Sequence, residues 1–342
     1  MEVLKALYLE SIGKELVLKE VPIPSNLAPD EVLVETELTG ICFRDVLTSK
    51  GFFPRARLPV ILGHEISGRI SKVGSEVTGF KEGDRVTSLI YEPCGKCSYC
   101  RSGRENLCRA KRTFGEDVDG SYASYVRVNS RSLVKAPDGV SSAGLAISAC
   151  VTGMLVHAFR SRAALQPGET VLVTGAGGGV GIHAVQIAGA LGARVIAATS
   201  SEWKAPKVRE AGAGDVIVWS EGFCDRVKKL TEGRGVDIVL EAVGSPTFAD
   251  SMHSLAPGGR LVVVGNVLPS PVSFQLGTLI LKELSVVGSL SSVRRDVEDA
   301  LKMTAEGKIK PIVHDTIPLE EASRGHKLMS DRATLGRVML KP

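Results

Sequence analysis

The sequence has no apolar run that approaches the ~18 residues of a membrane-spanning helix. Its first residues, MEVLKALYLESIG, lack the apolar core of a signal peptide, because the run is short and an acid follows it. Lys and Arg form only short pairs, and the net charge of +4 is small for 342 residues, which argues against nucleic-acid binding. We therefore expect a soluble cytoplasmic protein without a membrane or nucleic-acid partner.

Amide side chains are scarce, and repeats are absent. Asn and Gln together number seven, a shortage that is typical of proteins from thermophiles. The sequence contains no internal repeat and no low-complexity segment. Its length suits two domains, and 44% hydrophobic with 23% charged residues is typical of a globular protein.

The residue pattern changes near residue 148. Before it, short β segments separated by Gly and Pro predict a barrel-like all-β unit. After it, apolar β-branched runs alternate with helical stretches, as in a parallel sheet covered on both faces. From about residue 291 the chain predicts a helix, a second helical stretch and a last strand. We predict an α/β protein whose residue pattern changes at about residue 148 and again at about residue 291.

Four of the seven cysteines lie in the run CGKCSYCRSGRENLC, as Cys94, Cys97, Cys100 and Cys108. Two thiols two residues apart can hold one tetrahedral metal ion, and two more complete a four-thiolate shell for Zn²⁺ at about 2.3 Å. Two disulfides or free buried thiols are the alternatives, although spacing this dense strains disulfide geometry. We expect a structural zinc in a lobe at about 92–110.

A glycine-rich turn, GAGGGVG, follows the strand-like run at 170–175 and precedes a helical stretch. The dinucleotide fingerprint aligns best on Ala176, Gly178 and Gly181, with Ala in place of the first glycine, and the turn also contains Gly175, Gly179 and Val180. Glycines let the backbone approach a pyrophosphate, and the helix N-terminus offers free N–H groups. A tight turn that binds nothing is the alternative.

The second strand of this region ends without the acid that usually binds the ribose 2′-hydroxyl of NAD. Thr199, Ser200 and Ser201 come first, and the first acid is Glu202, with Lys204 close by. Hydroxyls and a lysine suit a 2′-phosphate better, so we favour NADP(H) over NAD(H). The alternative is that these are solvated loop residues.

Three further metal-ligand types are spread along the chain: Cys42 in GICFRD, His64 with Glu65 in LGHE, and Cys150. Two thiolates and one imidazole with an open fourth position make a catalytic zinc site. Glu65 is either the fourth ligand or a supporting group. Asp45 is placed to hold the His64 imidazole.

These motifs occur in the order of the zinc-containing medium-chain alcohol dehydrogenase family, which the whole chain resembles. The matching features are Cys42, GHE at 63–65, the four-cysteine lobe, GDRV at 83–86, Cys150 and the glycine-rich turn. The resemblance implies an α/β protein with a GroES-like catalytic domain at 1–147 and 291–342, interrupted by a Rossmann coenzyme domain at 148–290. It also implies a homodimer or homotetramer formed partly through residues 284–289.

The resemblance also assigns residues. It implies a catalytic zinc on Cys42, His64 and Cys150 with Glu65, and a structural zinc on the four clustered cysteines. It places Thr152, Val243, Gly265 and Ser289 along the nicotinamide and Arg337 near a phosphate.

The chain departs from the family pattern after the first zinc cysteine. Phe43 replaces the usual His or Arg, and Arg44 replaces the Ser or Thr whose hydroxyl relays the alcohol proton. A guanidinium stays protonated and cannot act as that relay. The segments CxRD, FFPR, CVTGM, GNVxPS and EGKIKP resemble archaeal acryloyl-CoA reductases within the family, where Arg44 would bind substrate or a coenzyme phosphate.

Three functions follow from these patterns. The complete zinc set favours alcohol–carbonyl interconversion of a small molecule with NADP(H). The missing relay hydroxyl favours the alternative, reduction of a 2-enoyl-CoA such as acryloyl-CoA. A minor alternative is a zinc- and nucleotide-binding protein without catalysis, whose basic lobe residues would bind nucleic acid; these are Arg101, Arg104, Arg109, Lys111 and Arg112.

Overall fold

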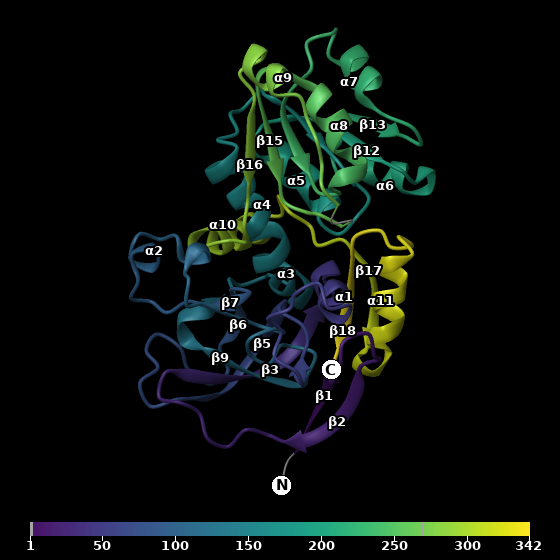
Figure 1. The fold of residues 1–342 in the computed structure, drawn as a ribbon. Coiled ribbons are helices and arrows are strands. Elements are labelled where there is room, and N and C mark those ends of the chain that lie inside the picture. The colour runs from purple at the N-terminus through teal and green to yellow at the C-terminus, as the bar shows by residue number, and fades with distance from the viewer. Residues whose placement is uncertain (1–2, 268–269) are drawn as a thin grey trace. The chain divides into compact units, whose positions relative to one another are not determined.

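A computed structural model describes residues 3–267 and 270–342, so the motif GNVLPS at 265–270 lies partly outside the described residues. The chain divides into two compact units (Figure 1). Unit 1 comprises Met1–Gly153, Ser291–Glu306 and Val313–Pro342, and unit 2 comprises Met154–Leu290 and Gly307–Ile312. The first border follows Gly153 rather than residue 147, so Cys150 belongs to unit 1.

Unit 1 is built on a mixed sheet in the order β10-β6-β5-β3-β18-β17, with β9 also paired to β3. A three-stranded sheet, β2-β1-β4, and the pair β7-β8 complete it. Its strands are β1 (Val3–Leu9), β2 (Val17–Pro22), β3 (Glu31–Gly40), β4 (Val60–Ile61), β5 (Ile66–Val73), β6 (Arg85–Ser88), β7 (Tyr91–Glu92), β8 (Arg112–Thr113), β9 (Tyr125–Asn129), β10 (Leu133–Lys135), β17 (Val313–Pro318) and β18 (Arg337–Lys341). Its helices are α1 (Phe43–Ser49), α2 (Ser98–Arg101), α3 (Ser142–Ala146), α10 (Arg294–Ala305) and α11 (Ala322–Ser330).

The last strand returns to the first half of the chain. β18 pairs antiparallel with β3, with Met339 opposite Gly40 and Leu340 opposite Thr39. β3 also pairs with β5 and β9, and its apolar side chains Val32 and Val34 are fully buried. This pairing joins the C-terminal residues to the segments that carry Cys42 and His64.

Unit 2 contains six parallel strands in the order β13-β12-β11-β14-β15-β16. They are β11 (Thr170–Val173), β12 (Arg194–Thr199), β13 (Asp215–Val218), β14 (Val236–Glu241), β15 (Leu255–Val263) and β16 (Ser285–Gly288). The helices are α4 (Met154–Val156), α5 (Gly181–Ala190), α6 (Ala205–Glu210), α7 (Cys224–Leu230), α8 (Ser245–His253) and α9 (Leu276–Leu281). Numbered within the unit, the order is 3-2-1-4-5-6, the doubly wound Rossmann order, which confirms the predicted fold class.

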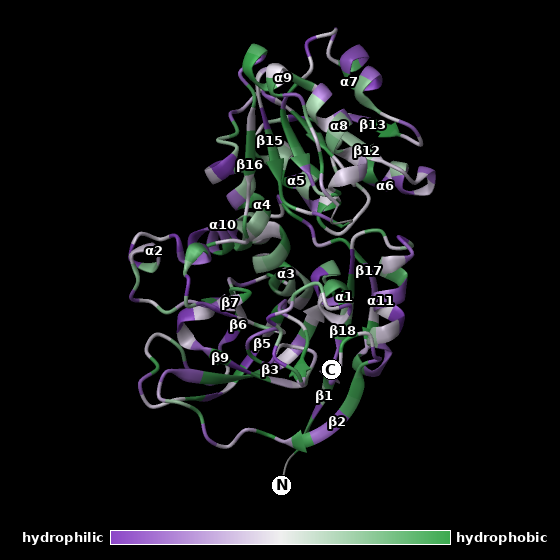
Figure 2. Cartoon of the chain, in the orientation of Figure 1, coloured by the Kyte–Doolittle hydropathy of each residue, from purple (hydrophilic) through white to green (hydrophobic). Residues whose placement is uncertain are grey.

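The sheet of unit 2 is the apolar layer of that unit. Figure 2 shows hydrophobic colouring along strands such as β15 and β16 and hydrophilic colouring on α7. The central strands β11 and β14 carry fully buried Val, Leu and Ile, because a parallel sheet has helices on both faces. Within the described ranges, every helix is too short or too polar to span a bilayer.

The stretch at 149–165, which has a helical composition, differs from an ordinary α-helix. It contains two π-helical segments, η3 (Ser148–Gly153) and η4 (His157–Arg162), on either side of α4. The N–H of Thr152 donates to the carbonyl of Ile147, five residues earlier, at 3.0 Å. Cys150 lies in the first of these segments, and π-helical turns frequently occur at functional sites.

Candidate metal centres and coenzyme site

The four clustered cysteines converge on one point of the lobe that follows β7. Cys100 Sγ lies 3.9 Å from Cys94 Sγ and 3.5 Å from Cys97 Sγ. All four sulfurs, with that of Cys108, lie within 4.8 Å of one another. Sulfurs at about 2.3 Å from one tetrahedral ion lie roughly 3.8 Å apart, whereas disulfide sulfurs lie about 2.05 Å apart. The spacing therefore fits a four-thiolate metal site, and every cysteine of the chain is unbridged.

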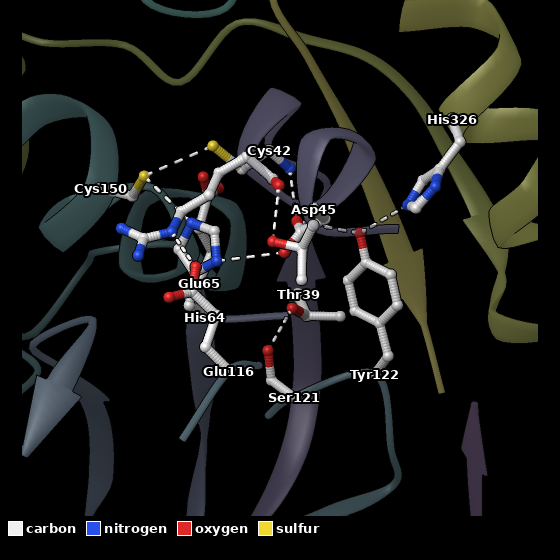
Figure 3. Close-up of polar contacts among 12 residues, drawn as sticks. Thr39, Cys42, Asp45, His64, Glu65, Glu116, Ser121, Tyr122, Cys150 and His326 are labelled. Carbon is white, nitrogen blue, oxygen red and sulfur yellow. Dashed lines mark hydrogen bonds and ion pairs between the residues drawn. The ribbon is translucent and has the colours of Figure 1, made fainter. Parts of the chain in front are cut away.

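A second group of metal-ligand side chains comes from three separate segments of unit 1 (Figure 3). Cys42 precedes α1, His64 and Glu65 precede β5, and Cys150 lies in η3. Cys150 Sγ is 3.8 Å from Cys42 Sγ and 3.4 Å from His64 Nε2. One ligand atom from each of the four residues lies within 4.8 Å of the others. The fold thus brings together the four residues that the sequence suggested for a catalytic zinc.

Hydrogen bonds among Cys42, Cys150 and His64 shift their pKa values and so determine the charge of this second group. The hydrogen bonds from Cys150 and His64 outweigh burial and hold the pKa of Cys42 well below the ordinary thiol value. The contact with Cys42, together with burial, raises the pKa of Cys150 well above that value. Burial opposes a charged imidazole, but Asp45 and Cys42 outweigh it and raise the pKa of His64 to about 10. A divalent metal ion binds thiolates and neutral imidazole, so these protons leave when it binds.

Asp45 contacts two members of this group. The Cys42 backbone N–H donates to Asp45 Oδ2 at 2.9 Å, which forms a capping box at the start of α1. Asp45 Oδ1 lies 3.1 Å from His64 Nδ1, so the other ring nitrogen faces the thiols. Burial tends to raise the pKa of Asp45, but the charge and hydrogen bond of His64 and the Cys42 N–H lower it. These contacts are typical of a carboxylate that orients a metal-binding imidazole.

Glu65 is fully buried and paired with the last strand. Arg337 Nη2 donates to Glu65 Oε1, whereas Glu65 Oε2 has no hydrogen-bond partner among the described residues. Burial raises the pKa of Glu65 to about 7, although the charge of Arg337 opposes the shift. Gly40 makes room for this carboxylate, because a Cβ there would lie 1.9 Å from Glu65 Oε2. A buried, unpartnered oxygen beside two thiols fits either role suggested for Glu65, metal ligand or support.

The predicted coenzyme residues of unit 2 gather at the carboxyl ends of its parallel strands. This is the edge at which doubly wound sheets bind dinucleotides. The glycine-rich turn follows β11, Thr199 to Ser201 follow β12, Val243 follows β14, Gly265 follows β15 and Ser289 follows β16. Thr152 and Arg337 instead belong to unit 1, and their contacts with a coenzyme stay a prediction.

Three positions of the turn require glycine. Gly175 has a φ of +58°, and a Cβ on Gly181 would lie 2.2 Å from the Gly175 carbonyl oxygen. A Cβ on Gly177 would lie 2.5 Å from Lys204 Cδ. Ala176, the residue in place of the first glycine, is fully buried, and its N–H donates to the Ala198 carbonyl. The turn therefore tolerates alanine at that place.

Lys204 lies against this turn and not in open solvent. Only 6% of the residue is exposed, and Nζ lies 5.1 Å from the centre of the Trp203 ring. Ser200 is exposed and Ser201 is half-buried, with the Ser201 N–H bonded to Thr199 Oγ1 at 3.3 Å. The interpretation of Lys204 as a solvated loop residue is thereby wrong, because Gly177 leaves a groove for its alkyl chain.

Two family models match the chain, "Zinc-binding dehydrogenase" at residues 179–306 and "Alcohol dehydrogenase GroES-like domain" at residues 28–138. An acryloyl-coenzyme A reductase from Metallosphaera sedula is 45% identical over 98% of this chain and 99% of its own length. A protein of the same name from Sulfurisphaera tokodaii is 42% identical over 99% of this chain and all of its own length. The chain belongs to the zinc-containing medium-chain alcohol dehydrogenase family. It is an oxidoreductase, so the minor alternative without catalysis is not supported.

Other members of the family extend the comparison. An NAD-dependent alcohol dehydrogenase from Sulfurisphaera tokodaii is 35% identical over 99% of this chain and all of its own length. The crystal structure of AibC has a TM-score of 0.93 at 42% identity and covers 99% of this chain and 96% of its own. A zinc-binding dehydrogenase from Sinorhizobium meliloti bound to NADP has a TM-score of 0.89 at 30% identity, with both chains fully covered.

Arg44 sets this enzyme apart from the family pattern at its second metal-ligand group. Arg44 Nε donates to Glu116 Oε1 at 2.6 Å, and the guanidinium carbon lies 4.9 Å from the centre of the Phe53 ring. Burial opposes the charge of Arg44, but Glu116 outweighs it and raises the pKa of the guanidinium. Among the described residues, no hydrogen-bond partner is recorded for its two Nη groups. A fixed cation with two free N–H₂ groups therefore lies two residues after Cys42.

Sequence reasoning missed residues that shape this dehydrogenase's sites, Glu116 among them. Glu241, at the end of β14, is fully buried, and its Oε1 accepts the N–H groups of Val243 and Gly244 at 2.8 and 2.9 Å. It therefore fixes the loop that precedes α8. The signal was present, because a carboxylate closes the apolar run VDIVLE.

Proposed function

We propose that this enzyme reduces the carbon–carbon double bond of a short 2-enoyl-CoA thioester, such as acryloyl-CoA, with NADPH. In this reaction NADPH and a proton convert the enoyl thioester to the saturated thioester and NADP⁺. The observation that carries the proposal is the Arg44–Glu116 pair, which stands where alcohol chemistry needs a hydroxyl. The two relatives named acryloyl-coenzyme A reductase, at 42% and 45% identity, support it.

We propose unit 1 as the catalytic domain and unit 2 as the coenzyme domain, with two zinc ions per chain. Cys94, Cys97, Cys100 and Cys108 would hold a structural ion. Cys42, His64 and Cys150 would hold a catalytic ion, with Glu65 as fourth ligand or support. The distances between the ligand atoms support both sites, and Glu65 Oε2, which has no hydrogen-bond partner among the described residues, supports the second.

The proposed chemistry divides between the bound groups and the side chains. When bound, Zn²⁺ supplies a Lewis acid and NADPH supplies hydride. Hydride addition to the β carbon places negative charge on the thioester oxygen. The Nη groups of Arg44 donate hydrogen bonds to that oxygen, while Glu116 and Phe53 hold the planar guanidinium group in position. The α carbon then takes its proton from water, because Arg44 cannot release one.

Alcohol–carbonyl interconversion is the second candidate. Two thiols and an imidazole grouped within 4.8 Å with a carboxylate favour it, since reduction of a carbon–carbon double bond has less need of a metal. Relatives named NAD-dependent alcohol dehydrogenase, at 35% identity, are consistent with it. The sequence alone favoured this function. We rank it second, because the Arg44–Glu116 pair and the relatives named acryloyl-coenzyme A reductase support thioester reduction.

A side-by-side assay of NADPH oxidation distinguishes the two functions. The purified zinc-loaded enzyme is given acryloyl-CoA, longer 2-enoyl-CoA thioesters, and small aldehydes and ketones. We expect the highest kcat/KM for a 2-enoyl-CoA thioester. Turnover of aldehydes or ketones without turnover of any thioester would contradict the proposal and favour the second candidate.

We further propose that NADPH binds more tightly than NADH. The loop after β12 offers hydroxyls at Ser200 and Ser201, and Lys204 lies beside the glycine-rich turn. The NADP-bound relative from Sinorhizobium meliloti supports this preference. The only acid nearby in sequence, Glu202, follows the strand end by three residues.

Replacing Ser200 by aspartate should reverse or reduce that preference. The new carboxylate repels a 2′-phosphate and can accept a bond from a free 2′-hydroxyl, so the ratio of the two Kd values should change by about tenfold, or ~1.4 kcal/mol. Coenzyme fluorescence titrations measure both Kd values. Ser161→Asp, which adds the same charge to η4, is the control and should leave the ratio unchanged. An unchanged ratio in Ser200→Asp would mean that the ribose lies elsewhere.

We propose a homodimer or homotetramer that forms partly along β16. This strand lies at the edge of its sheet, and edge strands readily pair with another chain. Val286 on it and Ile280 and Leu281 of α9 are apolar and exposed, the last at 88%. The free thiols fit a reducing compartment, which supports a cytoplasmic location.

A further inference from the structure

A chain of hydrogen bonds leads from His64 to helix α11 (Figure 3). His64 Nδ1 contacts Asp45 Oδ1 at 3.1 Å, and the Tyr122 hydroxyl contacts Asp45 Oδ2 at the same distance. The hydroxyl also lies 3.2 Å from His326 Nε2. Tyr122 is fully buried, and His326, on α11, is half-buried. Neither residue belongs to a motif that the sequence suggested.

The hydrogen atoms shared in this series of hydrogen bonds have one consistent arrangement. Asp45 Oδ2 accepts from the Cys42 N–H at 2.9 Å, and Asp45 Oδ1 lies 3.1 Å from His64 Nδ1, so both carboxylate oxygens face donors. Burial raises the pKa of Tyr122 well above its usual value, so the phenol keeps its hydrogen and donates it to Asp45. His326 Nε2–H must then donate to the Tyr122 oxygen. Each group thus fixes the orientation of the next, and the chain ends at His64.

Local backbone chemistry makes room for the Tyr122 ring. Gly63, just before His64, has a φ of +92°, and a Cβ there would lie 2.4 Å from Tyr122 Cδ1. Glycine therefore lets the ring lie directly against the segment that carries His64. On its other side the ring faces His326, with ring centroids 6.0 Å apart at 58°.

We propose that Tyr122 and His326 are positioning residues for the His64 metal centre and act through Asp45. The inference rests on the proposed function only in needing a metal at His64. Without the Tyr122 hydroxyl, Asp45 Oδ2 keeps only the Cys42 N–H, so the carboxylate and the imidazole lose part of their orientation. Partners that orient a metal-binding histidine typically contribute 10–100-fold to metal affinity.

The test measures zinc affinity, not turnover. Zinc-loaded protein is titrated with a chromophoric chelator, and the transition that Cys42→Ala abolishes identifies the His64 centre. We expect Tyr122→Phe and His326→Leu each to weaken zinc binding there by about tenfold or more. His326→Gln should retain the affinity, because its amide can still donate to Tyr122. Tyr122→Phe combined with His326→Leu should lose no more than Tyr122→Phe alone, since both act through one oxygen.

Tyr8→Phe is the matched control. Tyr8 packs against the same hydrophobic cluster as Tyr122, and its hydroxyl takes no part in the hydrogen bonds that link His64, Asp45, Tyr122 and His326. Unchanged zinc affinity in both Tyr122→Phe and His326→Leu would overturn the inference. An equal loss in Tyr8→Phe would also overturn it, because general loosening of the cluster would then explain the effect. Should Tyr122→Phe not fold, the comparison of His326→Leu with His326→Gln decides alone. Wild-type protein that binds only the lobe zinc would instead contradict the proposed metal centre itself.

Discussion

Replacing Cys97 by serine is expected to remove the lobe zinc and to lower the melting temperature by roughly 8–16 °C. A metal present at a thousand times its Kd contributes about 4.1 kcal/mol to folding, and ~1 kcal/mol corresponds to about 2–4 °C in a domain of 150–250 residues. A neutral hydroxyl cannot replace the thiolate as a soft ligand, so the three remaining sulfurs hold the ion weakly. Metal analysis and calorimetry measure the two effects.

Cys97→Ser should have only a small effect on kcat, in contrast to its large effect on the melting temperature. The reason is that the lobe cysteines form a group separate from the one around His64. Cys224→Ser is the matched control, because Cys224 is the one cysteine outside both groups and is also buried. It should keep two zinc ions and the wild-type melting temperature. Normal melting of Cys97→Ser would show that the lobe holds no structural metal.

The lobe and the parallel sheet were predictable because their signals are local. The four cysteines of the lobe lie between residues 94 and 108, so their spacing alone predicts that their thiols lie close together. In unit 2, a helix follows each strand from β11 to β15 and returns the chain to the end of the sheet where the strands begin. The alternation of strands and helices therefore predicts a parallel sheet. The glycine-rich turn could therefore be placed at the correct edge from the sequence.

The second metal-ligand group was predictable only from the order of family motifs. Cys42, His64 and Cys150 are far apart in sequence, and spacing does not show that they meet. The contact between Arg44 and Glu116 spans 72 positions, and that between Tyr122 and His326 spans 204. The hydrophobic periodicity of the sequence does not predict such contacts, because they depend on which strands become neighbours in the fold.

The structure differs from the sequence-based expectation at two places, around Cys150 and at Lys204. Both differences have local physical causes that a sequence pattern does not reveal. The stretch around Cys150 has helical composition, and apolar spacing over so few residues does not separate π from α turns. Lys204 is polar and lies in a polar segment, yet it is buried because Gly177 has no side chain to exclude it. Around Cys150, composition indicated a helix but not its π turns. For Lys204, composition suggested a solvated side chain, whereas the residue is buried.

Replacing Arg44 by threonine is expected to lower kcat/KM for acryloyl-CoA by roughly 10- to 150-fold, which corresponds to the ~1.5–3 kcal/mol of a hydrogen bond to a charged group. The variant loses the cation that meets the developing negative charge on the thioester oxygen. It also leaves Glu116, which is 8% exposed, without the partner that neutralises it. Initial rates of NADPH oxidation over a range of acryloyl-CoA concentrations measure the effect.

Companion variants separate charge, geometry and general damage. Arg44→Lys keeps a charge but loses the planar fork, so it should recover only part of the activity. Arg127→Thr, an exposed arginine of β9, removes the same charge elsewhere and should leave kcat/KM unchanged. Far-UV spectra and zinc content of Arg44→Thr should match the wild type, because Arg44 binds no metal in the proposed centre.

The same threonine tests the second candidate function from the opposite direction. It restores, two residues after Cys42, the kind of hydroxyl that relays the alcohol proton in this family. If alcohol chemistry is native, alcohol oxidation should hold or rise in Arg44→Thr while acryloyl-CoA is a poor substrate of both proteins. If thioester reduction is native, that activity falls and alcohol oxidation stays low in both. An Arg44→Thr enzyme with every activity unchanged would remove Arg44 from the mechanism, and with it the observation on which the proposed function depends.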